Sequence, residues 1–139
     1  EFRRVLFRST FDTSVLVPAL LSWHEHHAAC RAAALQARMV PAHVLLECFS
    51  VLTRLPAPYR LSPSDAGELI LRMPLTEVAL PTPQHRALVQ VLAASGIGGG
   101  AIYDGLIGAT ARHHNLTLLT RDVRARSVYE LVGVRLAMV

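Results

Sequence analysis

One stretch of the sequence, residues 98–122, constrains the fold more than any other. It contains a run of glycines, an amphipathic segment, a short apolar segment and then an acidic residue. Ile102, Leu106 and Ala109 recur at helical spacing, so a helix is predicted directly after the glycines. The apolar residues at 116–119 are typical of a buried strand. The stretch therefore predicts a helix packed on a strand, as in a layered α/β domain.

The same alternation of helical and strand patterns continues along the whole chain. Strands are expected up to residue 12 and at 39–41, 75–80, 116–119 and 134–139, and helices at 15–23, 25–39, 42–55, 65–73, 83–94, 101–114 and 123–131. Strands that alternate with helices form parallel sheets, because each crossover helix returns the chain to the same end of the sheet. We expect a single α/β domain with a central parallel sheet of four to five strands, flanked by helices on both faces.

Composition restricts the class of protein further. The chain has 139 residues, 52% of them hydrophobic, which is enough to bury one core. No apolar run reaches the ~18 residues of a membrane span. A secretion signal is not expected either, because Asp12 and the histidines at 24–27 interrupt the required pattern. Cys30 and Cys48 lack C-x-x-C spacing, which favours reduced thiols and a cytoplasmic location.

The first nine residues differ in character from the rest of the chain. The run EFRRVLFRS has no initiating Met, and its charged residues are crowded together in a way that does not suit a buried strand. We therefore expect a non-native leader over residues 1–9 and the domain itself over residues 10–139.

The positive charge comes entirely from arginine. All 14 basic residues are arginine, the formal net charge is +4 and the sequence pI is about 9.8. The guanidinium group binds phosphate through two parallel hydrogen bonds, and such attraction needs no particular base sequence. A phosphate-bearing partner is therefore compatible with the composition.

Two patterns that suggest metal or phosphate sites fail on their spacing. His24-Glu25-His26-His27 lacks the second histidine of H-E-x-x-H because position 28 is alanine, so a solvated helix start is favoured. The glycines at 98–100 are not followed by G-K-[ST], so a flexible turn is favoured over a phosphate-binding loop.

Acidic residues, in contrast, fall at informative positions. Of ten acidic residues, four are expected at or just beyond the carboxyl ends of strands: Asp12, Glu47, Asp104 and Asp122. Asp12 could instead be a helix cap, and Glu47 could be a solvated acid near a helix start. However, the carboxyl ends of parallel strands meet at one edge, where ligands bind. Converging carboxylates repel one another unless a cation lies between them, and oxygen ligands select Mg²⁺ or Mn²⁺. The four acids therefore indicate a metal site suited to phosphoryl chemistry.

At this point the sequence resembles a known family, the PIN-domain ribonucleases, and in particular the VapC toxins. Four motifs match in order: Phe11 to Val17, Glu47 in a helix after the second strand, DGLIGATA from Asp104, and Thr120-Arg121-Asp122. The resemblance covers nearly all of residues 10–139. It implies a PIN-like fold and a metal-dependent endoribonuclease that hydrolyses RNA phosphodiester bonds as the toxin of a toxin–antitoxin pair.

The resemblance also implies roles for individual residues. Asp12, Glu47 and Asp104 would be the main ligands of one or two divalent ions, Mg²⁺ or alternatively Mn²⁺, and Asp122 would be the fourth acid. Hydroxyl groups that orient ligands or water would come from Thr13, Ser14 and Thr120.

The partners that the resemblance implies are an RNA substrate, an antitoxin protein that fills the groove beside the site, and a second copy of the chain. Residues that could form an apolar antitoxin surface are Leu16, Leu20, Leu21 and Trp23, and burial in the core explains most of them equally well.

Two other functions are compatible with parts of the pattern. A non-catalytic PIN-like module would bind RNA or a protein without cutting it, but such a module has little need of four converging acids. A Mg²⁺-dependent phosphotransferase with Asp12 as its nucleophile normally has a second acid two residues later, where this chain has Ser14.

Overall fold

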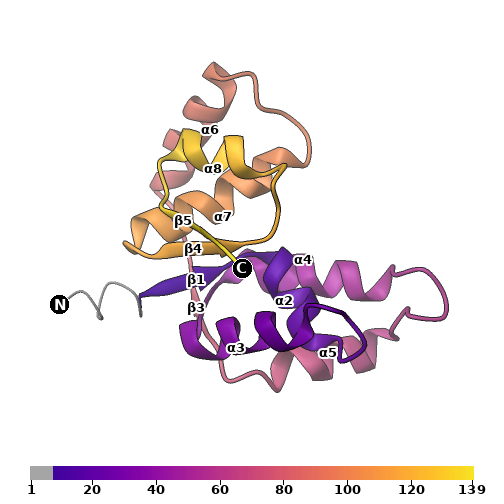
Figure 1. The fold of residues 1–139 in the computed structure, drawn as a ribbon. Coiled ribbons are helices and arrows are strands. Elements are labelled where there is room, and N and C mark those ends of the chain that lie inside the picture. Colours follow the sequence, from indigo (N-terminus) through magenta and orange to yellow (C-terminus); the bar gives the residue numbers. More distant parts are fainter. Residues whose placement is uncertain (1–7) are drawn as a thin grey trace.

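The computed structural model describes residues 8–139, and five short strands form its centre (Figure 1). They are β1 (Ser9–Phe11), β2 (Met39–Pro41), β3 (Thr76–Val78), β4 (Thr117–Thr120) and β5 (Leu136–Met138). Backbone hydrogen bonds join β1, β4 and β5 into one parallel sheet, and β2 and β3 into another. The Thr10 hydroxyl donates a hydrogen bond of 2.8 Å to the Met39 carbonyl, so β2 lies beside β1. The predicted parallel sheet is confirmed, with its ladder interrupted between β1 and β2.

Seven helices connect the strands within the described residues. They are α2 (Thr13–Leu20), α3 (His27–Ala37), α4 (Ala42–Thr53), α5 (Pro63–Leu71), α6 (Gln84–Ala94), α7 (Ala101–His113) and α8 (Arg126–Val132). Each corresponds to a predicted helix, with ends shifted by a few residues. The predicted leader at 1–9 lies outside the described residues except for Arg8 and Ser9, and Ser9 is already part of β1.

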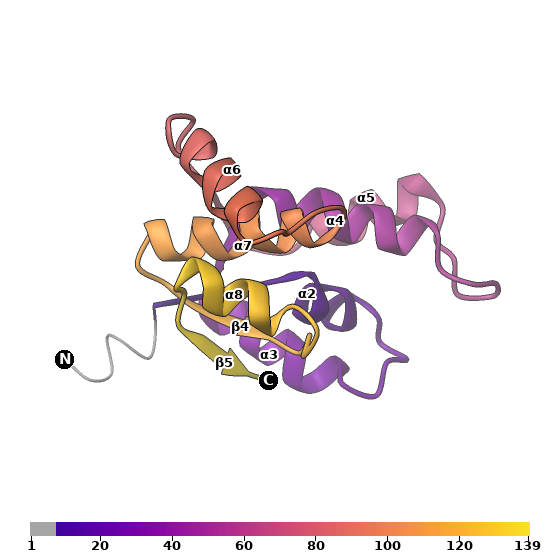
Figure 2. The ribbon, with the colours of Figure 1, turned by 90° about the horizontal axis from the view of Figure 1, so that it is seen from above.

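The strands lie between helices and point toward one edge of the molecule. In Figure 1, α6, α7 and α8 lie above the strands and α3 lies below them, and Figure 2 shows the same elements from above. Because β1 and β4 are parallel, the residues that follow these two strands emerge at the same edge. The acids of the predicted metal site are expected at that edge.

The core is mainly aliphatic, and it corrects one prediction from the sequence. Leu16, Leu20 and Leu21 are buried, so the apolar antitoxin surface predicted from them is wrong, whereas Trp23 is 52% exposed. The physical reason is that α2 packs against α3, α4 and β4, so that its leucines have neighbours on almost every side. Local periodicity does not reveal how many sides of a short helix are covered.

The buried face of α7 also differs from the apolar face that the sequence predicts for this helix. Ile102 is partly exposed, while Ile107 and Ala111 are fully buried. Gly108 explains this orientation, because a Cβ atom at that position would lie 2.7 Å from Cγ2 of Val132 in α8. The bare glycine lets α7 and α8 pack closely.

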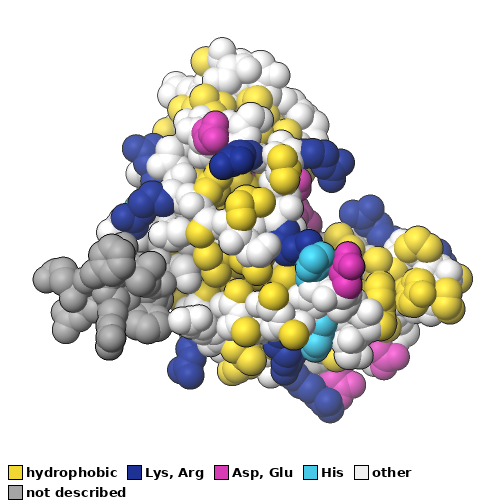
Figure 3. Space-filling model, in the orientation of Figure 1, with side chains coloured by type: hydrophobic (Ala, Val, Ile, Leu, Met, Phe, Trp, Pro, Cys, Tyr) yellow, Lys and Arg dark blue, Asp and Glu magenta, His cyan; other side chains and the backbone are white. Residues whose placement is uncertain are grey.

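Two further features of the described residues are the length of the helices and the distribution of charge on the surface. No helix within residues 8–139 is long and apolar enough to cross a membrane. Figure 3 shows arginine side chains distributed around one face, interspersed with hydrophobic patches and fewer acids. This distribution agrees with the net charge of +4.

Candidate active site

A pocket of about 340 Å³ opens beside the ends of β1 and β4. All four predicted acids line it, together with two of the three predicted hydroxyl residues. These lining residues are Asp12, Thr13, Ser14, Glu47, Asp104 and Asp122. The third hydroxyl residue, Thr120, is fully buried and contacts Asp12. The structure therefore brings together the residues that the sequence analysis selected.

Each acid reaches the pocket from a different element. Asp12 follows β1 and is the N-cap of α2, while Glu47 lies in the second turn of α4. Asp104 lies in the first turn of α7, and Asp122 follows β4 after one intervening residue. Asp12, Glu47 and Asp122 thus follow strands, as predicted. The predicted position of Asp104 at the end of a strand is wrong, because α7 follows α6, and it is the packing of α7 that brings Asp104 to the pocket.

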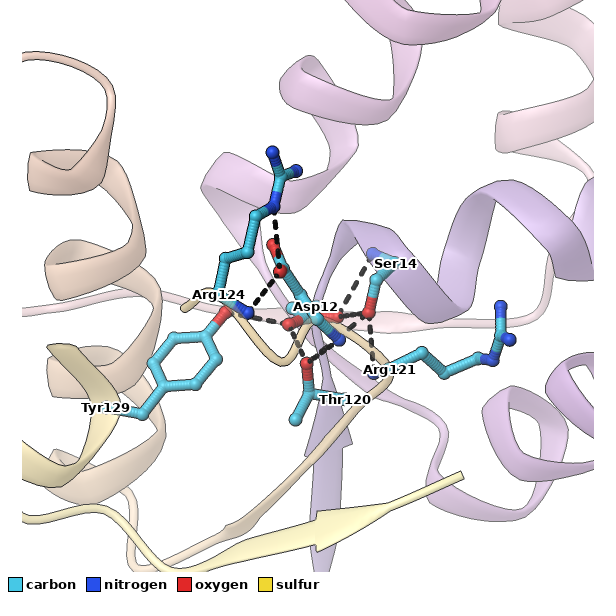
Figure 4. A network of polar contacts seen from close by, with 7 residues as sticks. Asp12, Ser14, Thr120, Arg121, Arg124 and Tyr129 are labelled. Atoms are coloured by element: carbon cyan, nitrogen blue, oxygen red, sulfur yellow. Dashed lines mark hydrogen bonds and ion pairs between the residues drawn. The ribbon is translucent and has the colours of Figure 1, made fainter. Parts of the chain in front are cut away.

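Asp12 is the most constrained of these acids (Figure 4). It is 3% exposed, and each of its carboxylate oxygens accepts two hydrogen bonds. Oδ1 accepts from the backbone N–H of Ser14 at 3.0 Å and from the Ser14 hydroxyl at 2.5 Å. Oδ2 accepts from the hydroxyls of Thr120 at 2.5 Å and Tyr129 at 2.7 Å. Asp12 is therefore both a helix cap and a residue of the pocket.

Burial and hydrogen bonding shift the pKa of Asp12 in opposite directions. Burial raises the pKa of the Asp12 carboxyl, and the hydrogen bonds from Ser14, Thr120 and Tyr129 act in the opposite direction. Burial and the neighbouring Asp12 carboxylate also raise the pKa of Tyr129. The phenol consequently stays a hydrogen-bond donor to Asp12 over the ordinary pH range.

A second set of hydrogen bonds fixes the loop after β4. The Ser14 hydroxyl accepts from the backbone N–H of Arg121 at 2.8 Å, and Thr120 Oγ1 accepts from that of Asp122 at 3.0 Å. Oδ1 of Asp122 in turn accepts from the backbone N–H of Arg124 at 3.0 Å. The start of α2 and the end of β4 are therefore held together by side chains of the site itself.

The acids act on one another electrostatically. Burial and, after it, the negative charges of Glu47, Asp122 and Asp12 together raise the pKa of Asp104 to about 6. An acid is disfavoured in its charged form when carboxylates stand nearby in a partly buried site. This effect shows that the four acids share one electrostatic environment.

The residues present fit a hard divalent cation by their chemistry. Carboxylate and hydroxyl oxygens are the donors that Mg²⁺ and Mn²⁺ prefer. Thr13 Oγ1 is buried without a hydrogen-bond partner among the described residues, which leaves an unused polar atom in a residue of the pocket wall. No three His, Cys, Asp or Glu side chains in residues 8–139 are placed closely enough to hold one ion together. The structure thus supplies the donors and defines no coordination geometry.

Three polar residues of this pocket, Tyr129, His24 and Arg121, were not among the predicted site residues. Tyr129 lines the pocket from α8. A tyrosine on the apolar face of a predicted helix is the signal that could have indicated it, because a buried phenol needs a hydrogen-bond partner. His24 was assigned to a solvated helix start. The helix begins at His27 instead, and His24 lies in the preceding turn, where it lines the pocket.

The chain is similar to known proteins both in sequence and in structure. The PIN domain family matches residues 10–131. Two proteins of Mycobacterium tuberculosis, Ribonuclease VapC27 and Ribonuclease VapC40, are 41% and 40% identical to the chain. These alignments cover 91% and 92% of this chain and 93% and 96% of the two relatives.

Two solved structures share the fold at low sequence identity. One shows VapBC2 from Rickettsia felis bound to a DNA fragment from their promoter, with a TM-score of 0.63 and 15% identity over 94% of this chain and 98% of that one. The other shows FitAB bound to the IR36 DNA fragment, with a TM-score of 0.62 and 19% identity over 93% of each chain. With the fold, the family match and the identity to the mycobacterial relatives in agreement, the chain belongs to the PIN-domain family and, within it, to the VapC group.

Proposed function

We propose that the chain is an endoribonuclease that hydrolyses RNA phosphodiester bonds with the help of Mg²⁺ or Mn²⁺. The observation that carries the proposal is the convergence of Asp12, Glu47, Asp104 and Asp122 in one pocket. The printed names of the two mycobacterial relatives, both ribonucleases, support the same activity. In the cell, the chain would act in the cytoplasm as the toxin of a toxin–antitoxin pair.

In this proposal the four acids hold the cation. A bound divalent cation would offset the charge of the phosphodiester and make water a better nucleophile. The contribution of the chain is to keep the acids in place: Ser14, Thr120 and Tyr129 fix the Asp12 carboxylate, and the loop after β4 fixes Asp122. Such preorganised groups avoid the cost of reorienting dipoles during the reaction.

Two arginines are placed to bind the phosphates of the substrate. Arg121 lines the pocket with the acids. Arg124 is almost fully exposed, and its Nε lies 3.7 Å from Oδ1 of Asp122. Phosphate contacts of this kind orient an RNA strand without reading its sequence.

One alternative that the sequence left open is a phosphotransferase with Asp12 as its nucleophile. Such an enzyme normally has a second acid two residues later, where this chain has Ser14, and the Ser14 hydroxyl donates a hydrogen bond to Oδ1 of Asp12. A phosphotransferase mechanism through Asp12 is therefore disfavoured.

The decisive experiment is cleavage of a fluorescently labelled single-stranded RNA. We expect cleavage with Mg²⁺ or Mn²⁺ and none in excess EDTA. The matched control is the Asp104→Asn variant, purified identically, because a contaminating nuclease would cut RNA in both preparations. Robust cleavage by the wild type in EDTA would sink the metal-dependent mechanism, and no cleavage under any metal condition would sink the activity.

An antitoxin partner is also proposed, because two of the solved structures that share this fold show VapBC2 and FitAB, each a two-component complex. Co-expression with the neighbouring reading frame should give a complex and relieve growth arrest. Failure of both would argue against a toxin. The homodimer stays a prediction.

A further inference from the structure

Aromatic rings from two separate segments form a path that leads from the acid pocket to solvent. His24 lines the pocket, and its ring centroid lies 5.8 Å from that of Trp23. Trp23 in turn stacks on Tyr59, with centroids 4.3 Å apart and planes inclined by 31°. Trp23 follows α2, whereas Tyr59 lies in the loop after α4. Residues 36 positions apart in sequence therefore meet beside the pocket.

This aromatic pair is open to solvent. Trp23 is 52% exposed and Tyr59 is 48% exposed, even though each covers part of the other. In Figure 3, histidine side chains and a hydrophobic patch lie side by side at the right, where Figure 1 places the loops that follow α2 and α4. An exposed aromatic surface next to a pocket is a feature of a binding site rather than of a core.

We propose that Trp23 and Tyr59 form a stacking platform for a nucleobase of single-stranded RNA, next to the phosphate that the acid pocket receives. This inference rests on the proposed function, and it adds a binding site outside the acids. Every nucleobase has a flat face that stacks on an aromatic ring, so the platform would bind RNA with little preference for sequence.

The platform is held in shape by backbone hydrogen bonds on both segments. The N–H of His24 donates to the Leu21 carbonyl at 3.0 Å, and that of Tyr59 donates to the Pro56 carbonyl at 2.9 Å. Just beyond Tyr59, the N–H of Leu61 donates to the Leu52 carbonyl at 3.1 Å. Both aromatic residues therefore sit in turns that are already ordered, which lowers the entropic cost of binding a base.

The charges around the platform suit the phosphates on either side of a stacked base. Arg121 lines the pocket with His24. Arg60 follows Tyr59, and its Nε donates a hydrogen bond of 2.9 Å to the Leu55 carbonyl, which positions its guanidinium group beside the loop. The acidic residue closest to Trp23 in the sequence is Glu25, and its carboxylate lies 3.2 Å from Nε2 of His26.

These observations favour RNA over a protein as the occupant. Proteins hold single-stranded nucleic acid with flat aromatic side chains that stack on the bases and with basic side chains that contact the phosphates. The aromatic pair and the neighbouring arginines provide this combination beside the acid pocket. Protein interfaces are also rich in tryptophan and tyrosine, but this pair adjoins, through His24, a pocket that contains Arg121 and the four acids.

The chain itself carries a probe for this proposal, because Trp23 is its only tryptophan. We would titrate the full-length Asp104→Asn variant, which is expected not to cut RNA, with a short oligouridylate in Mg²⁺ and follow tryptophan emission. An abasic oligonucleotide with the same number of phosphates is the matched ligand. We expect the oligouridylate to quench Trp23 and to bind about 5- to 150-fold more tightly than the abasic strand, as stacking of about 1–3 kcal/mol per base implies.

Substitutions at position 23 separate stacking from folding. Combined with Asp104→Asn, Trp23→Ala should weaken oligouridylate binding about 5- to 150-fold and leave abasic binding unchanged. Because this variant has no tryptophan, both affinities are measured by the fluorescence anisotropy of end-labelled strands. Trp23→Phe keeps a ring and should recover part of the affinity. Melting curves establish that both variants are folded, and since Trp23 is half exposed we expect little change in melting temperature.

The outcomes distinguish this proposal from the proposed function. If the wild type cuts RNA but oligouridylate and abasic strand bind the Asp104→Asn variant equally, and Trp23→Ala changes neither affinity, the platform is wrong and the nuclease stands. If Trp23→Ala leaves RNA binding intact and abolishes complex formation with a co-expressed antitoxin, the pair is a protein contact and the proposal is overturned. Absence of cleavage by the wild type would instead count against the nuclease itself.

Discussion

The hydroxyl of Tyr129 donates a hydrogen bond of 2.7 Å to Oδ2 of Asp12, although 117 residues separate the two in the sequence. The bond connects α8 to the loop between β1 and α2, and both residues are almost completely buried. Together with the bond from Thr120, it fixes the orientation of the Asp12 carboxylate. The packing of a helix at the end of the chain thus controls a residue of the site near its beginning.

The first prediction concerns this hydrogen bond. Tyr129→Phe keeps the ring and removes the donor, so one lone pair of a buried carboxylate loses its partner. We expect the free energy of unfolding to fall by about 1.5–3 kcal/mol, the range for hydrogen bonds to charged groups, and RNA cleavage to decrease. Urea unfolding measures the first effect. The control is Tyr59→Phe, the same chemical change at an exposed ring, which should stay within about 0.5 kcal/mol of wild type. Equal stability of Tyr129→Phe and wild type would contradict the expectation.

The second prediction concerns the contact between α7 and α8 that places Tyr129. A Cβ atom at Gly108 would lie 2.7 Å from Cγ2 of Val132 and 3.1 Å from Cδ1 of Tyr129. Gly108→Ala gains about 1 kcal/mol of helix propensity but overpacks a core contact, which typically costs about 1–3 kcal/mol. We expect a net loss of stability in urea and weaker cleavage.

Gly105→Ala is the matched control, because it is in the same helix and carries the same propensity gain. Its Cβ atom would meet the Cδ2 atom of Leu92 at 2.9 Å, at the end of a flexible side chain that can move. Gly105→Ala should therefore be clearly more stable than Gly108→Ala. If the two variants unfold at the same urea concentration, the close packing of α7 on α8 does not limit stability.

The convergence of Asp12, Glu47 and Asp122 could be predicted from the sequence because few positions follow the carboxyl end of a parallel strand. Asp12 follows β1 directly and Asp122 follows β4 after one residue, and the sequence patterns of those strands are short but clear. Asp104 is different, because its helix α7 follows α6 and not a strand. Asp12 had two possible roles, as a cap and as a site residue, and the structure shows that one carboxylate serves as the cap while lining the pocket.

Tyr129 and the exposed face of the molecule could not be predicted in the same way. The position of Tyr129 depends on how closely α8 approaches Gly108, and a local pattern does not encode the distance between two helices. For the same reason the sequence leaves both a surface and a core position open for the leucines of α2, such as Leu16 and Leu20, and tertiary packing buries them. Periodicity identifies a helix, and only the assembled neighbours decide which of its faces remain open.

The third prediction concerns the arginine beside the acids. Arg121→Ala should weaken RNA binding, and it should reduce the slope of log affinity against log salt concentration by about one, as expected for one lost phosphate contact. Arg135→Ala is the control: it removes the same charge, but Arg135 precedes β5 and its guanidinium contacts Asn115 before β4, at the opposite edge of the sheet. Equal salt slopes for Arg121→Ala and wild type would show that Arg121 does not contact phosphate.

The last prediction concerns the pH dependence of the ion-free protein. Burial and the charges of Glu47, Asp122 and Asp12 raise the pKa of Asp104 from 3.8 to about 6. Because the folded-state pKa lies above the unfolded value, the folded protein binds more protons than the unfolded chain between these two pH values. The contribution of Asp104 to stability is thus most favourable below about pH 4 and is lost as the pH rises through about 6.

Asp104→Asn removes this charge and keeps the shape of the side chain. In EDTA at neutral pH we expect the variant to melt at a higher temperature than the wild type, and the difference to shrink as acid protonates Asp104 in the wild type. Added Mg²⁺ should stabilise the wild type by mass action and the variant much less, while cleavage by the variant is abolished. Melting curves across pH, with and without Mg²⁺, measure all three effects. If the variant melts well below the wild type in EDTA at neutral pH, Asp104 stabilises the start of α7 as an ordinary first-turn acid, and its assignment to the cation site is wrong.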